Sequence, residues 1–370
     1  MRGGISNVQL PIANWVAATL GVFCLAAGWK VAEPGWQYGF PRDHQAHPDF
    51  KTEWWYFTGN LADQSGRRFG YELTFFRQGI RPPNDRAGTS SRFIVDDLKF
   101  AHFTVTDPAG TKFHFYDKAS RGSFGDAGFD EGERLAWIDR WRLERKADGS
   151  FDLAADAAEA KIALHLVPQK EPVIHGQGGI SRKAESAGHA SHYYSITRLT
   201  TSGDLRIGKE AFTVTGESWF DHEWATNQLA PGQAGWNWVS AQFEDGTELM
   251  LYEMRLTNGS IDPASSGTFV RADGSALPLT SADFVMTPET FWRSPATKAN
   301  YPIGWHVLVP KEQLDFRIKP VLANQELVFS PLIYWEGAFD VAGTRAGKPL
   351  AGRGYLELTG YAAPLDELNR

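Results

Sequence analysis

The segment Thr52–Leu61 reads TEWWYFTGNL, and Gly70–Arg77, a few residues later, reads GYELTFFR. Both segments are short and rich in aromatic residues, and Asp63–Gly66 between them has the composition of a turn. Aromatic side chains suit the pleated, half-buried surface of a β-sheet. These two segments therefore predict β-strands, and they favour an all-β fold.

Segments of the same kind recur along the chain, with Gly and Pro between them and little helical periodicity. The further strands that we expect are Phe100–Thr106, Lys112–Tyr116, Trp141–Arg145, Phe151–Ala155, Lys161–Val167, His192–Thr200, Leu205–Ile207, Ala211–Trp219, Trp236–Ala241, Glu248–Leu256, Trp305–Val309, Leu314–Ile318, Ile333–Ala338 and Gly354–Gly360. Each half of the chain carries about the number of strands that an up-and-down barrel needs. We therefore predict two β-barrel domains in tandem, over residues 41–225 and 226–370, which meet near Ala225–Gly235. Two long polar stretches, Arg81–Arg92 and Pro168–Ala190, are expected to be lids or entrances.

The composition narrows the classes of partner and site. The 370 residues include 14 Trp, 24 Phe and 11 Tyr, and such rings can line an apolar cavity. The formal net charge is −7 and the Lys and Arg residues are scattered, so no basic stripe is available for nucleic acid. Attraction to an anionic membrane surface is weak for the same reason. Cys24 is the one cysteine of the sequence, so a chain that loses it can have no disulfide and no Cys-based metal site.

The N-terminal region has the pattern of a targeting segment. Val16–Ala27 is apolar and uncharged, and the small residues Ala26, Ala27 and Gly28 at its end suit cleavage, so we expect residues 1–28 to be a signal peptide that exports the protein to the periplasm or beyond. The apolar run is short for a membrane span, which needs about 20 residues, although an uncleaved N-terminal anchor stays open. Phe23 before Cys24 does not suit a lipoprotein cleavage site. Residues 29–40, rich in Pro and Gly, are expected to be an extended linker.

The aromatic strand Thr52–Leu61 carries rings on both of its faces. Side chains alternate along a strand, so Trp54 and Tyr56 would face one way and Trp55 the other. One set would fill a barrel, and the other would pack outside it. Rings that face a lumen could also form the wall of an apolar pocket, so all three are candidates for substrate binding.

A second motif, Gly216–Trp224, reads GESWFDHEW. Alternation places Trp219, Asp221 and Glu223 on one face, and Trp224 on the other. Two close carboxyls among indole rings raise the pKa of at least one of them, which would make a proton donor available near neutral pH. Two interpretations stay open at this point, because Asp221 could equally cap the following loop while Glu223 pairs with a surface Arg.

A third motif includes His192 and Tyr194, which share a strand face. A single His on a strand is more often a hydrogen-bonded structural residue than a catalyst. A metal site made of His189, His192, His222 and Glu223 is a minor alternative, since the sequence has no metal-ligand spacing such as H-E-x-x-H. We therefore expect no metal and no organic cofactor.

Three segments, His47–Leu61, Gly70–Arg77 and Gly216–Trp224, together resemble the AttH-like family, which contains the carotenoid 1,2-hydratases and proteins described as predicted secreted hydrolases. Tyr334–Val341 and Gly354–Tyr361 resemble the second lipocalin-like domain of that family. The likeness covers nearly all of the chain after the expected signal peptide. It implies two lipocalin-like barrels in tandem and, in the hydratase branch, addition of water to a terminal isoprenoid double bond.

The hydratase branch resembles this sequence at four positions, His192, Tyr194, Trp219 and Asp221. In that branch a Trp is expected at the position of Tyr194 and a Tyr at that of Trp219, and the residues after the aspartate also differ. These departures put carotenoid specificity in doubt. They leave the scaffold intact.

These observations lead to one hypothesis and two alternatives. In the hypothesis, neutral Asp221 protonates an alkene of an isoprenoid or lipid-like ligand, Trp219 and Tyr194 stabilise the cation, and His192 positions the water. Further residues expected at the ligand are Trp54, Trp55, Tyr56, Glu223 and Trp224. The alternatives are a non-catalytic periplasmic lipid carrier and a secreted hydrolase, and peripheral membrane association is left open. A carrier is favoured if Asp221 points away from the pocket.

Export predicts that the mature protein has lost its N-terminal residues. We expect intact-mass measurement of the protein purified from the periplasm to give a chain that starts near Gly28. Retention of Met1–Leu20 in the soluble periplasmic protein would contradict the signal-peptide interpretation.

Overall fold

The computed structural model describes residues 28–86, 91, 93–329, 332–363 and 365. The expected signal peptide therefore lies outside the described residues, apart from Gly28. Within the described part of the chain, no helix combines the length and the hydropathy of a membrane-spanning segment. Its helices are single turns of 3-10 helix: η1 (Arg42–His44), η2 (Pro83–Asp85) and η3 (Pro310–Glu312).

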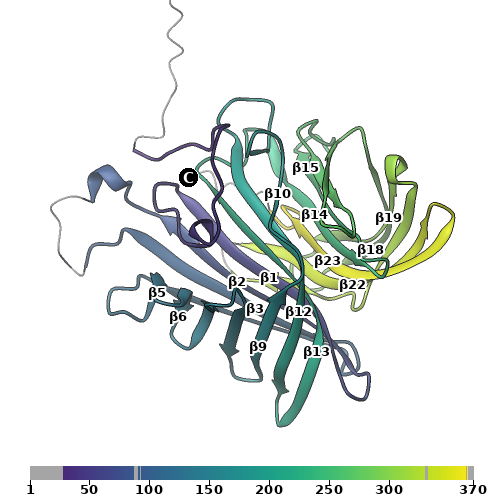
Figure 1. Ribbon diagram of the computed structural model, residues 1–370, viewed down its shortest axis with the longest axis horizontal. Coiled ribbons are helices and arrows are strands. Elements are labelled where there is room, and N and C mark those ends of the chain that lie inside the picture. The colour runs from purple at the N-terminus through teal and green to yellow at the C-terminus, as the bar shows by residue number, and fades with distance from the viewer. Residues whose placement is uncertain (1–27, 87–90, 92, 330–331, 364, 366–370) are drawn as a thin grey trace, which may run out of the picture.

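The strands of the described residues form two separate antiparallel sheets, which lie beside each other in Figure 1. The N-terminal sheet contains β1 (Thr52–Asp63), β2 (Arg68–Gly79), β3 (Asp97–Asp107), β4 (Lys112–Ser120), β5 (Ala127–Glu131), β6 (Arg134–Ile138), β7 (Trp141–Arg145), β8 (Phe151–Asp156), β9 (Ala160–Pro168), β10 (Val173–Ile174), β11 (Ser181–Arg182), β12 (Ala190–Ile207) and β13 (Glu210–Ala225). The C-terminal sheet contains β14 (Gln233–Phe243), β15 (Glu248–Leu256), β16 (Ser266–Val270), β17 (Ala276–Thr280), β18 (Val285–Arg293), β19 (Asn300–Val309), β20 (Leu314–Pro320), β21 (Glu326–Val328), β22 (Ile333–Arg345) and β23 (Lys348–Thr359).

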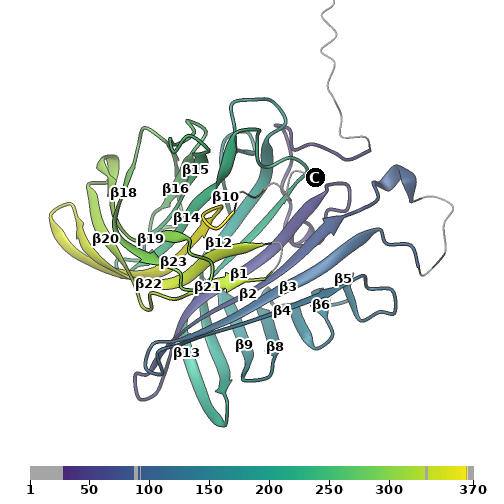
Figure 2. The same ribbon diagram turned by 180° about the vertical axis from the view of Figure 1, so that it is seen from behind.

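Both sheets follow the same path. In the first, β1 to β4 form a meander, the chain passes to β5 at the opposite edge, and the strands return through β12 to β13, which pairs with β1. In the second, β14 to β17 form the meander, β18 starts the return, and β23 pairs with β14. Each sheet therefore curls into a barrel whose first and last strands are joined, as seen from behind in Figure 2. The all-β fold with two lipocalin-like barrels in tandem is confirmed.

The alternation predicted for the aromatic strands is present in β1. Trp55 and Phe57 lie in the hydrophobic core of the N-terminal barrel and are fully buried. Trp54 and Tyr56 point outward and belong to a different cluster, which is made by residues of both barrels. The outer face of β1 is thus covered by the second barrel, which explains why both of its faces are apolar.

The two barrels are held together by more than apolar contact. The buried carboxylate of Glu248, on β15, accepts hydrogen bonds from Arg198 of β12 and from Lys170, both at 2.7 Å. His175 bridges Ser195 and Thr268 with its two ring nitrogens. Lys170 and His175 belong to the long polar stretch Pro168–Ala190, which therefore lies between the barrels and also contributes β10 and β11 to the first sheet.

One glycine decides how closely three strands of the first barrel approach. The ring of Tyr71, on β2, lies over Gly59 of β1, and its hydroxyl shares a 2.7 Å hydrogen bond with Ser218 of β13. A Cβ at Gly59 would lie 2.4 Å from Cε1 of Tyr71 and 2.6 Å from Oγ of Ser218. This contact across β1 is possible because residue 59 has no side chain.

We therefore expect Gly59→Ala to destabilise the protein by about 1–3 kcal/mol, the usual cost of overpacking a core. Gly39→Ala is the matched control, because a Cβ there would meet no atom closer than 3.5 Å and only the flexible side chain of Arg42. Urea unfolding of both variants measures the difference. Equal midpoints would contradict the packing that we describe for Tyr71.

Candidate active site between the barrels

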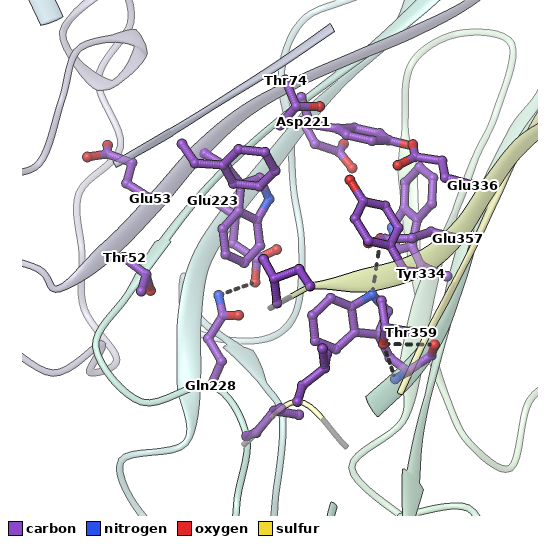
Figure 3. A pocket seen from close by; sticks show the side chains of 18 of the residues that line it. Thr52, Glu53, Thr74, Asp221, Glu223, Gln228, Tyr334, Glu336, Glu357 and Thr359 are labelled. Carbon is purple, nitrogen blue, oxygen red and sulfur yellow. Dashed lines mark hydrogen bonds between the residues drawn. The ribbon is translucent and has the colours of Figure 1, made fainter. Parts of the chain in front are cut away.

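A pocket of about 130 Å³ lies between the outer faces of the two barrels (Figure 3). Its walls come from β1, β2, β3, β12 and β13 of the first domain and from β14, β15, β22 and β23 of the second. Aromatic and aliphatic side chains dominate, and several carboxyl groups lie among them. The residues that matter below are Trp54, Tyr56, Lys183, Tyr193, Asp221, Glu223, Trp238, Tyr252, Tyr334, Glu336 and Glu357.

The N-terminal wall is a product of strand register. Tyr56 of β1 lies directly opposite Asp221 of β13, which lies opposite Ser195 of β12. Two residues along the strand, on the same face, Trp54 lies opposite Glu223, which lies opposite Tyr193. Residues opposite each other in a sheet share a face, so these two rows present their side chains together to the second barrel.

The C-terminal wall is built in the same way. Glu336 of β22 lies opposite Glu357 of β23, and Glu357 lies opposite Trp238 of β14. Trp238 in turn lies opposite Tyr252 of β15. Figure 3 shows the side chains of Asp221, Glu336 and Glu357 around the same cavity.

Asp221 is buried and is held by three neutral hydrogen-bond donors. Its Oδ2 accepts from the hydroxyl of Tyr193 at 2.7 Å, and its Oδ1 accepts from the indole of Trp219 at 2.6 Å and from the hydroxyl of Ser195. Trp238 donates to the oxygen of Tyr193 at 3.1 Å and so directs the Tyr193 proton toward Asp221. Burial raises the pKa of Asp221 to about 7, although the three hydrogen bonds act in the opposite direction.

Glu223 has a partner of opposite charge. Lys183 lies 2.9 Å from its carboxylate, and Gln228 donates a weaker hydrogen bond at 3.4 Å. The ammonium of Lys183 also lies 4.2 Å from the ring centroid of Tyr252, a cation–π contact. Lys183 is buried, but the charge of Glu223 raises its pKa, so it stays a cation. Glu223 and Lys183 thus form a buried ion pair at the edge of the pocket.

The structure brings together only some of the predicted site residues. Trp54, Tyr56, Asp221 and Glu223 line the pocket, and Trp219 lies directly behind Asp221.

The remaining predicted residues lie on the opposite face of the same strands. Tyr194, Trp55 and Trp224 belong to the core of the N-terminal barrel, and the ring of His192 contacts Trp224 there. The expectation that His192 and Tyr194 reach the pocket of Asp221 does not match this geometry. Strand alternation is the reason, because Tyr193 and Ser195 occupy the outward positions between and beside them.

The alternative metal set is not gathered in the fold. Glu223 faces the pocket, whereas His192 and His222 face the barrel interior. Among the described residues, the acidic and imidazole groups close enough to share an ion are His47, Glu53 and His222. Both imidazoles already bond to Oε1 of Glu53, at 2.7 and 3.0 Å, and Arg77 donates to Oε2 at 3.0 Å. With a guanidinium already paired to the carboxylate, we interpret this group as a charged hydrogen-bond network inside the barrel.

Sequence reasoning missed most residues of the pocket, among them Tyr193, Lys183, Glu336 and Glu357. Tyr193 could have been found from alternation, since it is the outward neighbour of Glu223 on β12. Glu336 and Glu357 lie in the motifs Tyr334–Val341 and Gly354–Tyr361, but nothing local indicates that two strands of the second barrel face Asp221. Lys183 lies in a polar stretch with no periodic pattern and gave no signal.

Comparisons with known proteins agree with this architecture. Residues 31–361 match the family described as AttH-like. The chain belongs to the AttH-like family. This AttH-like protein is 35% identical to an AttH of known crystal structure from Nitrosomonas europaea, with a TM-score of 0.79 over 90% of this chain and 99% of that one.

Two more distant relatives are enzymes by name. Kievitone hydratase from Nectria haematococca shares the fold at 13% identity, with a TM-score of 0.68 over 91% of this chain and 98% of that one. The dehydratase asqC of Emericella nidulans is 20% identical over 251 residues, which are 64% of this chain and 68% of that protein.

The buried carboxyls make the stability of this AttH-like protein depend on pH. Unfolded Asp and Glu lose their protons near about pH 4, whereas folded Asp221 keeps its proton up to about pH 7. The folded state then binds more protons than the unfolded state, so the free energy of unfolding falls as the pH rises through 7. Buried histidines with lowered pKa, such as His102 and His175, oppose this trend only below about pH 6.5, where unfolded His is charged.

We expect the melting temperature to fall between about pH 6.5 and 8.5. Glu72→Gln should weaken this dependence, because burial and the nearby charge of Glu357 raise the pKa of Glu72. Glu72 is fully buried, with Oε1 bonded to Thr74 and Oε2 without a partner, so the amide fits the site. Glu171→Gln, at an exposed position, is the control. A melting temperature that rises over this range would contradict the raised pKa values.

Proposed function

We propose that this AttH-like protein is a hydratase or dehydratase, which adds water to or removes it from an apolar, isoprenoid-like substrate bound between the two barrels. The observation that carries the proposal is the position of Asp221. Its carboxyl lies in an apolar, aromatic pocket, and its pKa of about 7 suits proton transfer in either direction near neutral pH. An exposed carboxylate would have lost its proton long before that pH.

The pocket suits the end of an isoprenoid chain better than a whole carotenoid. Its volume of about 130 Å³ is close to the ~150 Å³ of an engineered apolar cavity that holds benzene. A terminal unit of five or six carbon atoms fits this space, and the rest of a longer substrate would extend through the mouth. The rings of Trp54, Tyr56 and Trp238 would surround a carbocation formed there, with about 2 kcal/mol available from each desolvated cation–π contact.

The names of two relatives support the reaction class. One is a hydratase and the other a dehydratase, which are the two directions of a single reaction. Both relatives are distant, so the support extends to the reaction class and not to the substrate. Carotenoid 1,2-hydratase activity is the narrower form of this proposal, and the substitutions at Tyr194 and Trp219 weigh against it.

The carrier and the hydrolase are less well supported. A carrier was expected to direct Asp221 away from the pocket, whereas Asp221 lines it. A hydrolase would have to rely on a water activated by Asp221, because the sequence supplies no nucleophile motif. Export to the periplasm, with a cleaved signal peptide, remains part of our proposal on the strength of the N-terminal sequence.

Asp221→Asn tests the proposal. Geraniol, which ends in a dimethyl-substituted double bond, and other isoprenoid alkenes and tertiary alcohols would be incubated in ¹⁸O-labelled water. The wild type should place ¹⁸O in a tertiary hydroxyl group, and Asp221→Asn should lower the rate by at least about 10²-fold, the low end of acid–base catalysis. Mass spectrometry of the products and the melting temperature of the variant would be measured together.

Asp130→Asn is the matched control. The pKa of Asp130 is also raised, to about 6, by partial desolvation, but its side chain is exposed, accepts a hydrogen bond from the backbone N–H of Ala46 and does not line the pocket. It should retain wild-type activity. Unchanged turnover in Asp221→Asn, or loss of the fold in that variant, would make the role of Asp221 structural and favour the carrier.

A further inference from the structure

Glu336 and Glu357 form an unusual pair on the wall that faces Asp221. They lie directly opposite each other on β22 and β23, where side chains on the same face have Cβ atoms about 4.5–5.5 Å apart. Both line the pocket, and Glu336 is 1% exposed. Two ionised carboxylates at such a position would repel each other strongly.

No positive charge compensates this repulsion. Among the described residues, neither carboxyl has a Lys, Arg or His within ion-pair distance. The titratable groups that face Glu336 are instead acids or phenols: Glu72 on β2, Tyr56 on β1, Asp221 on β13, Tyr334 on β22, and Glu357 and Tyr355 on β23. Burial and the charges of Glu72 and Glu357 raise the pKa of Glu336, and burial together with the charges of Glu223 and Asp221 raises that of Glu357. Such a pair keeps one proton near neutral pH.

Hydrogen bonds and burial favour Glu336 as the member that holds that proton. Oε2 of Glu357 accepts a 3.1 Å hydrogen bond from the indole of Trp236, which favours the ionised form. Oε1 of Glu336 is buried without a hydrogen-bond partner, and burial with the neighbouring charges raises the pKa of Glu336 although the hydroxyl of Tyr56 acts to lower it. A protonated Glu336 is therefore available as a donor in the pocket wall.

Asp221 has the opposite environment. Its three neighbours, Tyr193, Ser195 and Trp219, all donate to its oxygens, which is the arrangement expected around a carboxylate. Because burial raises its pKa to about 7 despite these donors, the carboxylate of Asp221 is basic enough to take a proton from the attacking water. The pocket thus has a carboxylate, Asp221, on the first barrel and a carboxyl pair that holds one proton, Glu336 and Glu357, on the second.

We propose that Glu336 and Glu357 form a carboxyl dyad in which protonated Glu336, beside ionised Glu357, is the catalytic acid, while Asp221 is the catalytic base. This assignment rests on the proposed function and reverses the role that the sequence suggested for Asp221. Each domain then supplies one half of the acid–base pair, so that the reaction requires the barrels to be packed together.

The reaction balances without a cofactor. In hydration, the O–H bond of Glu336 breaks, and its proton joins the CH carbon of the terminal double bond through the π electrons, which leaves a tertiary cation on the dimethyl-substituted carbon. A water oxygen forms the C–O bond with the resulting tertiary cation, and one water proton passes to the carboxylate of Asp221. The proton then returns from Asp221 to the dyad, and dehydration runs through the same steps in reverse.

The pH dependence of kcat/KM separates the members of the dyad. With geraniol in ¹⁸O-labelled water, Glu336→Gln should lose at least about 10²-fold in rate because the acid is gone. Glu357→Gln removes the neighbouring negative charge, so Glu336 loses its proton at lower pH, and the alkaline limb of the profile should move down by a measurable fraction of a pH unit. Glu253→Gln is the control, because Glu253 is a buried β15 acid that bonds to Asn237 outside the pocket.

Infrared difference spectra test the proton directly and need no substrate. At about pH 8, replacing Glu336 should remove one carbonyl band of a protonated carboxylic acid, whereas Asp221→Asn should remove a carboxylate band. If the wild type hydrates neither geraniol nor the other isoprenoid alkenes but still shows the protonated-acid band of Glu336, the proposed function is wrong and the dyad stands. Full activity with an unshifted profile in Glu336→Gln would overturn the dyad. So would a protonated band of unchanged intensity in both dyad variants, recorded in a Glu72→Gln background because the pKa of Glu72 is itself raised to about 8.

Discussion

Twelve residue pairs join β1 to β13, the first and last strands of the N-terminal barrel, and most other features of the site follow from this ladder. It joins the two halves of the sheet, β1 to β4 and β5 to β13, and it fixes which side chains of the two aromatic motifs lie next to one another. Because successive side chains along a strand point to opposite faces, the two faces of this ladder have different environments. Its inner face joins the barrel core, and its outer face meets the second domain.

The pKa of a buried carboxyl is lowered on the inner face of this ladder and raised on its outer face. Glu53, on the inner face, is surrounded by His47, His222 and Arg77, and these charges and hydrogen bonds hold its pKa well below the ordinary value although burial acts against them. Asp221, on the outer face, has only neutral donors, so burial prevails and its pKa rises. Burial alone therefore does not decide whether a carboxyl is an anion or an acid, since the charge of its neighbours does.

Because the pocket lies between the two barrels, the residues that line it can change without changes in either core. Its walls come from strands of two barrels with the same topology, and the loop Pro168–Ala190 carries Lys183 into the gap between them. Substitutions on the outer face of either barrel can reshape the ligand space without disturbing either core. The hydrophobic residues of the two barrel cores do not line the pocket.

The sequence by itself determined the all-β class, the two barrels and, for Thr52–Leu61 and Gly216–Trp224, which side chains share a strand face. These features depend on the β-propensity of each residue and on the alternation of side chains along a strand, and both can be read from the sequence. It also indicated Asp221, because a carboxyl between indoles is costly wherever it is buried. Tertiary structure decided the rest. The register between β12 and β13 puts Tyr193 and Ser195, and not His192 and Tyr194, beside Glu223 and Asp221, and alternation within one strand does not give that register. Nor does alternation show whether an outward face meets water or another barrel, so the acids Glu336 and Glu357, more than a hundred residues away in the chain, were missed.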